Sequence, residues 1–247
     1  MSKFVETEYG STKEILKFPD HYVALAVMVG DSGVAAVNGK KIVPKGTIVG
    51  GATASVLENL DQAVAGKYVP IKTATLLTGS ADDDNVIVWT AVTAGAAGND
   101  VEIKMVVGGT TAALSVAVAA KVITVTVANT DGTATSTAKE VADKINADAS
   151  AKVLVVATAA NPDSTKAVAA VEQTALAGGA DAAITGAEGV LMNDVDVTYG
   201  PKEGAMIIHG FVKIDALPYG TANAAIPGLI AADAAAAKAF SAIKFIK

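Results

Sequence analysis

The spacing of apolar residues predicts a protein built mainly from β-strands. In the first 72 residues, Asn38-Gly39 is a hairpin signal, because both residues tolerate the positive φ of a tight turn. Residues 55–65 place apolar side chains at helical spacing and predict a helix. Pro70 marks the last strand of this part as an edge strand, because proline cannot donate to a ladder. The strands predicted here are 22–29, 33–37, 41–43, 47–50 and 67–72.

The middle of the chain predicts further strands and one helix. Thr137 and Glu140 have the spacing of a capping box, and apolar residues then recur on one face, so a helix is predicted over 137–149. The predicted strands, rich in β-branched residues, are 85–92, 101–107, 113–119, 122–128, 153–157 and 171–176.

The last 60 residues return to strands, predicted at 189–192, 195–198 and 204–214. Residues 231–240 are rich in alanine and predict a helix, and 242–246 predict a terminal strand. The expected fold class is therefore mainly β with some α, an α+β protein.

Aromatic residues divide the chain into two kinds of sequence. Trp89 is the only aromatic residue between Tyr68 and Tyr199, and Pro162 is the only proline in that stretch. The simplest explanation is a domain inserted into a loop of another domain. We expect a discontinuous domain of residues 21–73 plus 188–247 and an inserted α+β domain of residues 74–187.

Residues 1–20 mix charged and apolar side chains without clear periodicity, and Pro19 ends any helix there. Two interpretations stay open: a disordered tail, or an arm that orders on a partner. The apolar residues that such an arm could bury are Phe4, Ile15, Leu16 and Phe18.

Charge and composition narrow the classes of function. The net charge is −6, and all 19 basic residues are lysine. Arginine is preferred for phosphate recognition, so its absence from an acidic chain argues against nucleic-acid binding. The chain has no cysteine, which excludes disulfides and thiolate metal sites and fits a reducing cytoplasm. No uncharged apolar run is long enough to span a membrane, and residues 1–20 lack a signal-peptide core.

Three groups of residues resemble chemical sites, and each has a plainer interpretation. Residues 30–33, Gly-Asp-Ser-Gly, resemble a serine-protease nucleophile segment, but a turn between strands is the favoured interpretation, and His21 and His209 are the only histidines. Residues 82–85, Asp-Asp-Asp-Asn, could hold a cation or form a solvated acidic loop. Asp194, Asp196 and His209 could perform acid–base chemistry or lie on a half-exposed strand. We expect no catalytic site, no metal and no cofactor.

The two ends of the chain resemble a known family. Residues 188–200, EGVLMNDVDVTYG, and 204–212, GAMIIHGFV, resemble the C-terminal half of tailed-phage head decoration and head fibre proteins. Residues 40–51, 67–71 and the ending KFIK are similar to other parts of that family. Residues 89–100, WTAVTAGAAGND, and the elements after them resemble a module found in phage virion proteins.

The resemblance implies a non-enzymatic protein on the outer surface of an icosahedral head, made in the cytoplasm of the bacterial host. Proteins of the lambda decoration type bind the major capsid protein as trimers at local three-fold positions and stabilise the shell. By this analogy the discontinuous domain binds the capsid, and the inserted domain projects outward. The residues expected to bind the capsid are Phe4, Ile15, Leu16 and Phe18, and those expected at the trimer contact are Ile208, His209, Phe211 and Phe245.

An alternative is a tail-associated or host-surface adhesin, in which the inserted domain binds the host cell surface. An enzyme is the least favoured interpretation, since it depends only on Asp194, Asp196 and His209.

Overall fold

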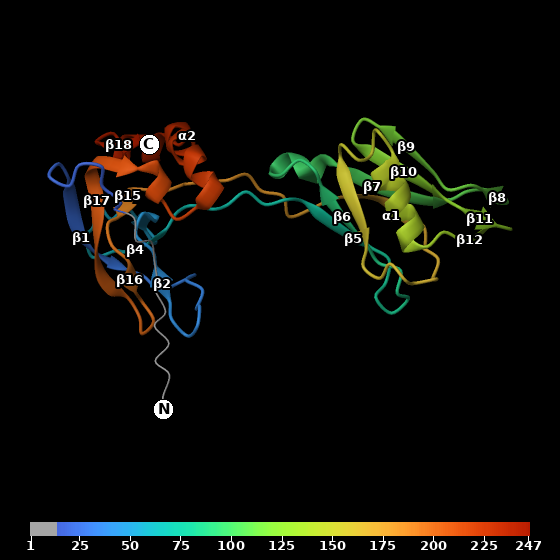
Figure 1. The fold of residues 1–247 in the computed structure, drawn as a ribbon, viewed down its shortest axis with the longest axis horizontal. Coiled ribbons are helices and arrows are strands. Elements are labelled where there is room, and N and C mark those ends of the chain that lie inside the picture. Colours follow the sequence, from blue (N-terminus) through green and yellow to red (C-terminus); the bar gives the residue numbers. More distant parts are fainter. Residues whose placement is uncertain (1–13) are drawn as a thin grey trace, which may run out of the picture. The chain divides into compact units, whose positions relative to one another are not determined.

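The computed structural model describes residues 14–247 and has a β-rich α+β fold, with 38% of residues in strands and 16% in helices. Contacts divide the chain into two compact units. Unit 1 contains residues 14–70 of the described chain and residues 183–247, and unit 2 contains residues 71–182. Figure 1 colours unit 1 blue and orange to red, and unit 2 green to yellow. The boundaries expected from the sequence, 74 and 187, lie within a few residues of this division.

Unit 1 is a closed β-barrel. Its ring order is β1-β4-β3-β15-β17, and β17 pairs again with β1, so the sheet closes on itself. Closure leaves these strands without free edges. The strands of the ring are β1 (Val23–Val29), β3 (Ile48–Gly51), β4 (Ala63–Gly66), β15 (Gly189–Leu191) and β17 (Lys202–Lys213).

Side chains alternate between the barrel interior and an outer layer. On β17, Met206 belongs to the interior cluster, while Ile207 packs with the outer cluster. The outer cluster includes residues of α2 (Ile226–Ala232) and α3 (Ala234–Ala239). The short helices η2 (Ile214–Ala216) and η3 (Gly220–Ala225) lead into α2. β18 (Ile243–Ile246) pairs in parallel with the end of β17.

A two-strand ladder lies beside the barrel, between β2 (Ile42–Val43) and β16 (Val195–Asp196). The predicted hairpin turn precedes it: Asn38 and Gly39 have φ of 51° and 79°, and Val37 and Lys40 exchange both backbone hydrogen bonds. The strand predicted over 33–37 is otherwise absent.

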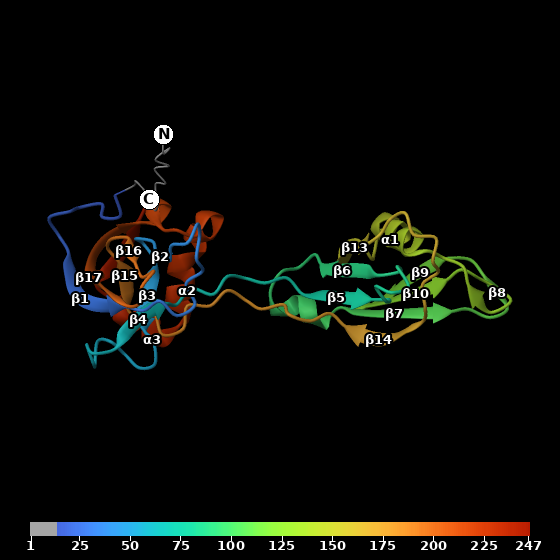
Figure 2. The ribbon, with the colours of Figure 1, turned by 90° about the horizontal axis from the view of Figure 1, so that it is seen from below.

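Unit 2 contains two main sheets and one helix. The four-stranded sheet has the order β14-β7-β10-β9, and the three-stranded sheet has the order β13-β6-β5. Figure 2 shows both, with α1 (Ala138–Ala147) beside β13. The strands are β5 (Thr75–Thr78), β6 (Ile87–Ala91), β7 (Glu102–Val107), β9 (Ser115–Ala119), β10 (Val122–Val127), β13 (Val155–Ala159) and β14 (Val171–Ala175).

The smaller elements of unit 2 are the helix η1 (Ala96–Asp100) and a three-stranded ribbon. The ribbon consists of β8 (Thr111–Ala112), β11 (Asn129–Thr130) and β12 (Thr133–Ala134).

The core of unit 2 surrounds Trp89, which is fully buried on β6 and donates its Nε1–H to Thr78 Oγ1 at 2.8 Å. The predicted helix is confirmed as α1, with both hydrogen bonds of the Thr137–Glu140 capping box present. Its buried residues, among them Val141 and Ile145, pack into the same core.

Two helix predictions need correction. Residues 55–65 form turns followed by β4, so the helix predicted there is wrong. The Ala-rich segment is two short helices: α2 ends before Asp233, and Asp233 Oδ1 accepts from Ala236 N at 2.9 Å to cap α3.

Candidate functional site

The arm expected over residues 1–20 lies partly outside the described residues, and Phe4 is among the residues not described. Where the chain is described, Ile15 and Leu16 are each only 2% exposed and belong to the outer core cluster of unit 1. Leu16 also bridges to Val212 of β17. The expected capsid-binding role of Ile15 and Leu16 is corrected: so little of either side chain is exposed that it is a core residue of unit 1.

An aromatic patch forms where this segment meets the C-terminal half of β17. The rings of Phe18 and Phe211 contact edge to face, with centroids 5.2 Å apart. Val23 lies opposite His209 in the β1–β17 ladder. Tyr22 lies next to Gly210: a Cβ atom at position 210 would be only 3.2 Å from the Cβ of Tyr22. We call this surface, made of Phe18, Tyr22, Val23, His209 and Phe211, the aromatic patch.

Much of the aromatic patch is open to solvent. Phe18 is 47% exposed, Tyr22 40% and Val23 49%, and His209 is also exposed. Contiguous exposed apolar side chains on a soluble protein mark interaction surfaces more often than scattered ones do. Tyrosine and phenylalanine are also enriched at protein interfaces.

The aromatic patch brings together Phe18, which was expected to bind the capsid, and His209 and Phe211, which were expected at the trimer contact. The structure does not bring Ile208 and Phe245 to the same surface. Ile208 packs against the barrel interior, and Phe245 packs with the outer core, stacked on Phe240 at 6.1 Å. Tyr22 and Val23, which the sequence placed in the strand predicted over 22–29, are exposed next to these residues.

The serine-protease interpretation of residues 30–33 fails on distance. Ser32 follows the end of β1, while His21 and His209 lie beside its start. Seven strand residues span about 20 Å, far beyond a hydrogen bond. The segment is the turn after β1.

Asp194, Asp196 and His209 are not one site either. Asp194 Oδ1 accepts from Lys45 N at 2.7 Å, and Asp196 Oδ1 accepts from Thr198 N at 3.0 Å. The hydrogen bonds from Thr198 lower the pKa of Asp196. Lys202, at the start of β17, also contributes to that lowering, whereas His209 lies seven residues further along the strand. Both aspartates therefore act as turn and loop partners.

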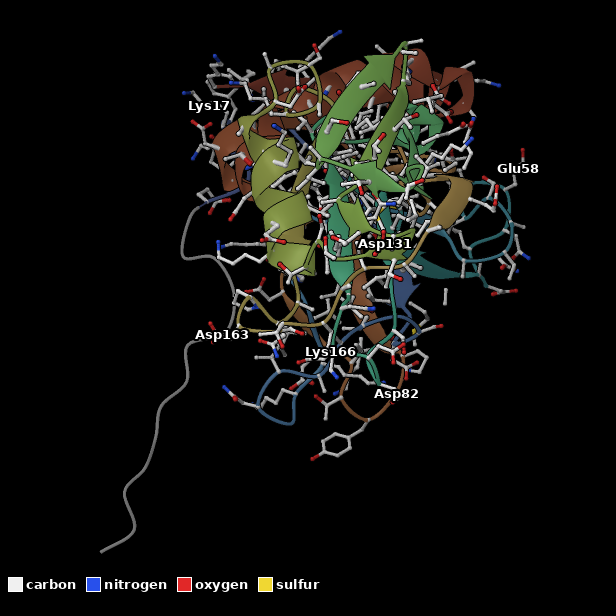
Figure 3. All side chains as sticks on the ribbon, turned by 90° about the vertical axis from the view of Figure 1, so that its right-hand side faces the viewer. Lys17, Glu58, Asp82, Asp131, Asp163 and Lys166 are labelled. Atoms are coloured by element: carbon white, nitrogen blue, oxygen red, sulfur yellow. The ribbon has the colours of Figure 1, made fainter. Side chains whose placement is uncertain are left out.

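The acidic loop at 82–85 is tied to a neighbouring loop. Asn161 Nδ2 donates to Asp84 Oδ2 at 2.6 Å, and Asn85 Nδ2 donates to the Ala167 carbonyl at 2.9 Å. Asp82, Asp163 and Lys166, labelled in Figure 3, lie on these two loops. Within residues 14–247, no group of three or more acidic or histidine side chains is placed to hold a metal ion.

Unit 1 also has a pocket of about 630 Å³ that no sequence pattern indicated. Glu188 lines this pocket, and its carboxylate accepts from Gly51 N at 2.7 Å, from Val56 N at 3.0 Å and from Ser55 Oγ. Burial acts to raise the pKa of Glu188, but these hydrogen bonds outweigh burial and hold the pKa below its ordinary value. The carboxylate is engaged by these donors, so Glu188 organises the loop of residues 51–57.

Comparisons with protein-family models, with curated proteins and with solved structures gave no match to this chain. Among residues 14–247, no helix has the length and apolarity needed to cross a bilayer.

Proposed function

We propose that this chain is a non-enzymatic structural protein of a phage virion that binds the outside of an icosahedral head through unit 1. It binds the major capsid protein as a homotrimer at local three-fold sites, stabilises the shell and displays unit 2. The proposal rests on the resemblance of residues 188–212 to head decoration proteins.

The structural observation that supports the proposal is the aromatic patch. The patch brings together two segments that lie before and after unit 2 in the sequence, residues 18–23 and β17. β17 also contains residues 204–212, the second of the two segments that resemble the phage family. A patch rich in aromatic residues is suited to a protein contact, and we assign it to the contact between copies in the trimer.

The net negative charge of the chain also supports the proposal. A protein of net charge −6 without arginine is suited to an outer surface that does not meet packaged DNA. Many identical contacts on a symmetric shell add through avidity, so each contact can be modest.

The experiment that tests the function is co-sedimentation of the full chain with expanded, undecorated heads of its own phage. Saturation near one copy per capsid subunit is expected. No sedimentation with heads, together with binding of the chain to host cells, would replace this proposal with the adhesin interpretation.

The role of the aromatic patch is tested separately with Val23→Lys. A lysine in the trimer contact should lower both trimer formation and head binding, measured by analytical ultracentrifugation and co-sedimentation. Val37→Lys is the matched control, because Val37 is 60% exposed on the hairpin tip of the same unit. Equal behaviour of the two variants would remove the patch from the contact.

A further inference from the structure

The three-stranded sheet of unit 2 has an outer face without a charged side chain at its six ladder positions. β6 alternates strictly: Ile87, Trp89 and Ala91 are buried, so Val88 and Thr90 point outward. The ladders with β5 and β13 then give two rows of three residues. The first row is Leu77, Val88 and Thr158, and the second is Thr75, Thr90 and Val156. We call these six residues the neutral face.

The neutral face is open where it is most apolar. Leu77 is 67% exposed and Val156 49% exposed. Val92, which follows β6, is 51% exposed. The outer face of the four-stranded sheet differs, because Glu102 and Lys104 on β7 are only half-buried while their neighbours Ile103 and Met105 are buried in the core.

Each edge strand of the same sheet is covered at one backbone position by another part of unit 2. On β13, Asn146 of α1 pairs with the backbone of Ala157: its Nδ2 donates to the carbonyl at 2.8 Å, and its Oδ1 accepts from the N–H at 3.0 Å. On β5, Thr75 and Ala177 exchange two backbone hydrogen bonds of 2.8 and 2.9 Å. Covered backbone positions hinder strand addition there, which favours a contact through the face of this sheet.

We propose that the neutral face is a contact surface for a second copy of this chain. The arrangement of its corners is self-complementary: Leu77 and Val156 occupy one diagonal, and Thr75 and Thr158 occupy the other. A two-fold axis in the plane of the contact, along the Thr75–Thr158 diagonal, lays Leu77 of one copy on Val156 of the next. The strands of the two sheets then cross near a right angle, which is one of the two common arrangements of packed sheets.

The net charge of the chain also favours contact between two copies through the neutral face. Two copies that each carry a net charge of −6 repel on average, and a two-fold contact through charged residues sets like charges near one another. The six ladder positions of the neutral face meet those of a second copy without such a pair.

The area sets the strength of the contact. Two rows on three strands cover on the order of 200 Å² per copy, from the spacing of strands and residues in a sheet. Specific stable interfaces bury about 1,200–2,000 Å² in total. The contact is therefore weak between free copies, and it forms when copies are held close enough for a high effective concentration.

Cysteine trapping tests the proposal on the full chain, which contains no cysteine of its own. Leu77→Cys and Val156→Cys proteins are mixed at high concentration under mild oxidation. The mixture should form disulfide-linked dimers severalfold faster than either protein alone. The rate of dimer formation in the mixture should also exceed that of the Ala117→Cys protein, a control in which the cysteine is on the exposed outward side of β9.

A second substitution adds a charge at an exposed position of the face. Thr158→Lys, placed in both cysteine proteins, should remove the acceleration, because the two lysines meet near the axis. Trp89 emission and circular dichroism verify that unit 2 is folded. Equal rates for the mixture and for Ala117→Cys would overturn the proposal. A second result would also overturn the proposal. If the Leu77→Cys protein bound host cells, and Thr158→Lys abolished that binding without changing the rate of disulfide trapping, the partner of the neutral face would be a different molecule.

Discussion

Unit 1 and unit 2 differ in how they use aromatic residues, and the difference separates two kinds of surface. All ten phenylalanines and tyrosines of the chain lie outside residues 71–182, and Trp89 is the only aromatic residue within them. In unit 1, aromatic side chains extend from the outer core to the exposed patch around Phe18 and Tyr22. Unit 2 buries its single aromatic ring and leaves threonine, valine and leucine outside.

The comparison suggests that each unit makes a different contact. Aromatic side chains supply large contact areas at a small cost in conformational entropy, which suits a stable interface. A small face of threonine and valine gives a weaker contact that depends on local concentration. Unit 1 is therefore suited to attachment, and unit 2 to contact between copies that are already attached.

The largest expected effect tests whether the units unfold separately. Ile123→Ala in unit 2 and Ile48→Ala in unit 1 each empty a fully buried site and should each cost about 2–5 kcal/mol of unfolding free energy. Denaturation of unit 2 is followed by Trp89 fluorescence. Denaturation of unit 1 is followed by tyrosine fluorescence or by resolved methyl NMR signals. Each substitution should shift only the transition of its own unit. A common shift in both probes would mean that the units unfold as one.

The next largest effect is expected at Glu188. Glu188→Ala leaves the Gly51 and Val56 N–H groups without their acceptor and should lower the stability of unit 1 by about 2–4 kcal/mol. Ser55→Ala, which removes one donor and keeps the carboxylate, should cost less. Urea denaturation of both variants measures the difference, and an equal loss would contradict the role of the carboxylate.

The lowered pKa of Glu188 also predicts a pH dependence limited to unit 1. Its stabilising contribution is complete well above the ordinary value of 4.5, and it is lost as the pH falls through the lower pKa of the folded state. Glu188→Gln should flatten the acid limb of the unit 1 stability curve and leave that of unit 2 unchanged.

A smaller effect is expected at the start of α1. Thr137→Ala removes the side-chain cap on the Glu140 N–H and should cost unit 2 about 1 kcal/mol. Thr137→Ser, which keeps the hydroxyl, is the control and should recover most of that loss. Thermal unfolding followed at Trp89 distinguishes the two variants.

The smallest effect on stability is expected at His209. The side chain is exposed, so His209→Ala should change the unfolding free energy of unit 1 by less than about 0.5 kcal/mol. It should nevertheless weaken the proposed trimer, measured by sedimentation equilibrium. A trimer of unchanged stability would exclude His209 from the contact.

Local patterns predicted the elements whose stabilising groups are close in sequence. The capping box of Thr137 and Glu140 and the Asn38-Gly39 turn each depend on residues within three positions, and both are confirmed. The alternation around Trp89 likewise gave the β6 strand.

Elements that depend on distant residues were not predicted correctly. Residues 55–65 have helical spacing, yet Glu188, more than 130 positions away, accepts hydrogen bonds from Ser55 and Val56 and holds a turn there. Ile15 and Leu16 resembled a free arm because their burial depends on β17 and the helices after it. Barrel closure through β1 and β17 and the aromatic patch have the same origin in contacts between the two ends of the chain.

The most direct test of the account is whether attachment to heads belongs to unit 1 alone. A chain in which residues 71–182 are replaced by a short flexible linker is made, and its folding is verified by circular dichroism. It is then titrated against the full chain for sites on expanded heads. The account predicts that the shortened chain saturates heads at the same copy number and displaces the full chain. A folded shortened chain that does not bind heads, while the full chain binds, would contradict it.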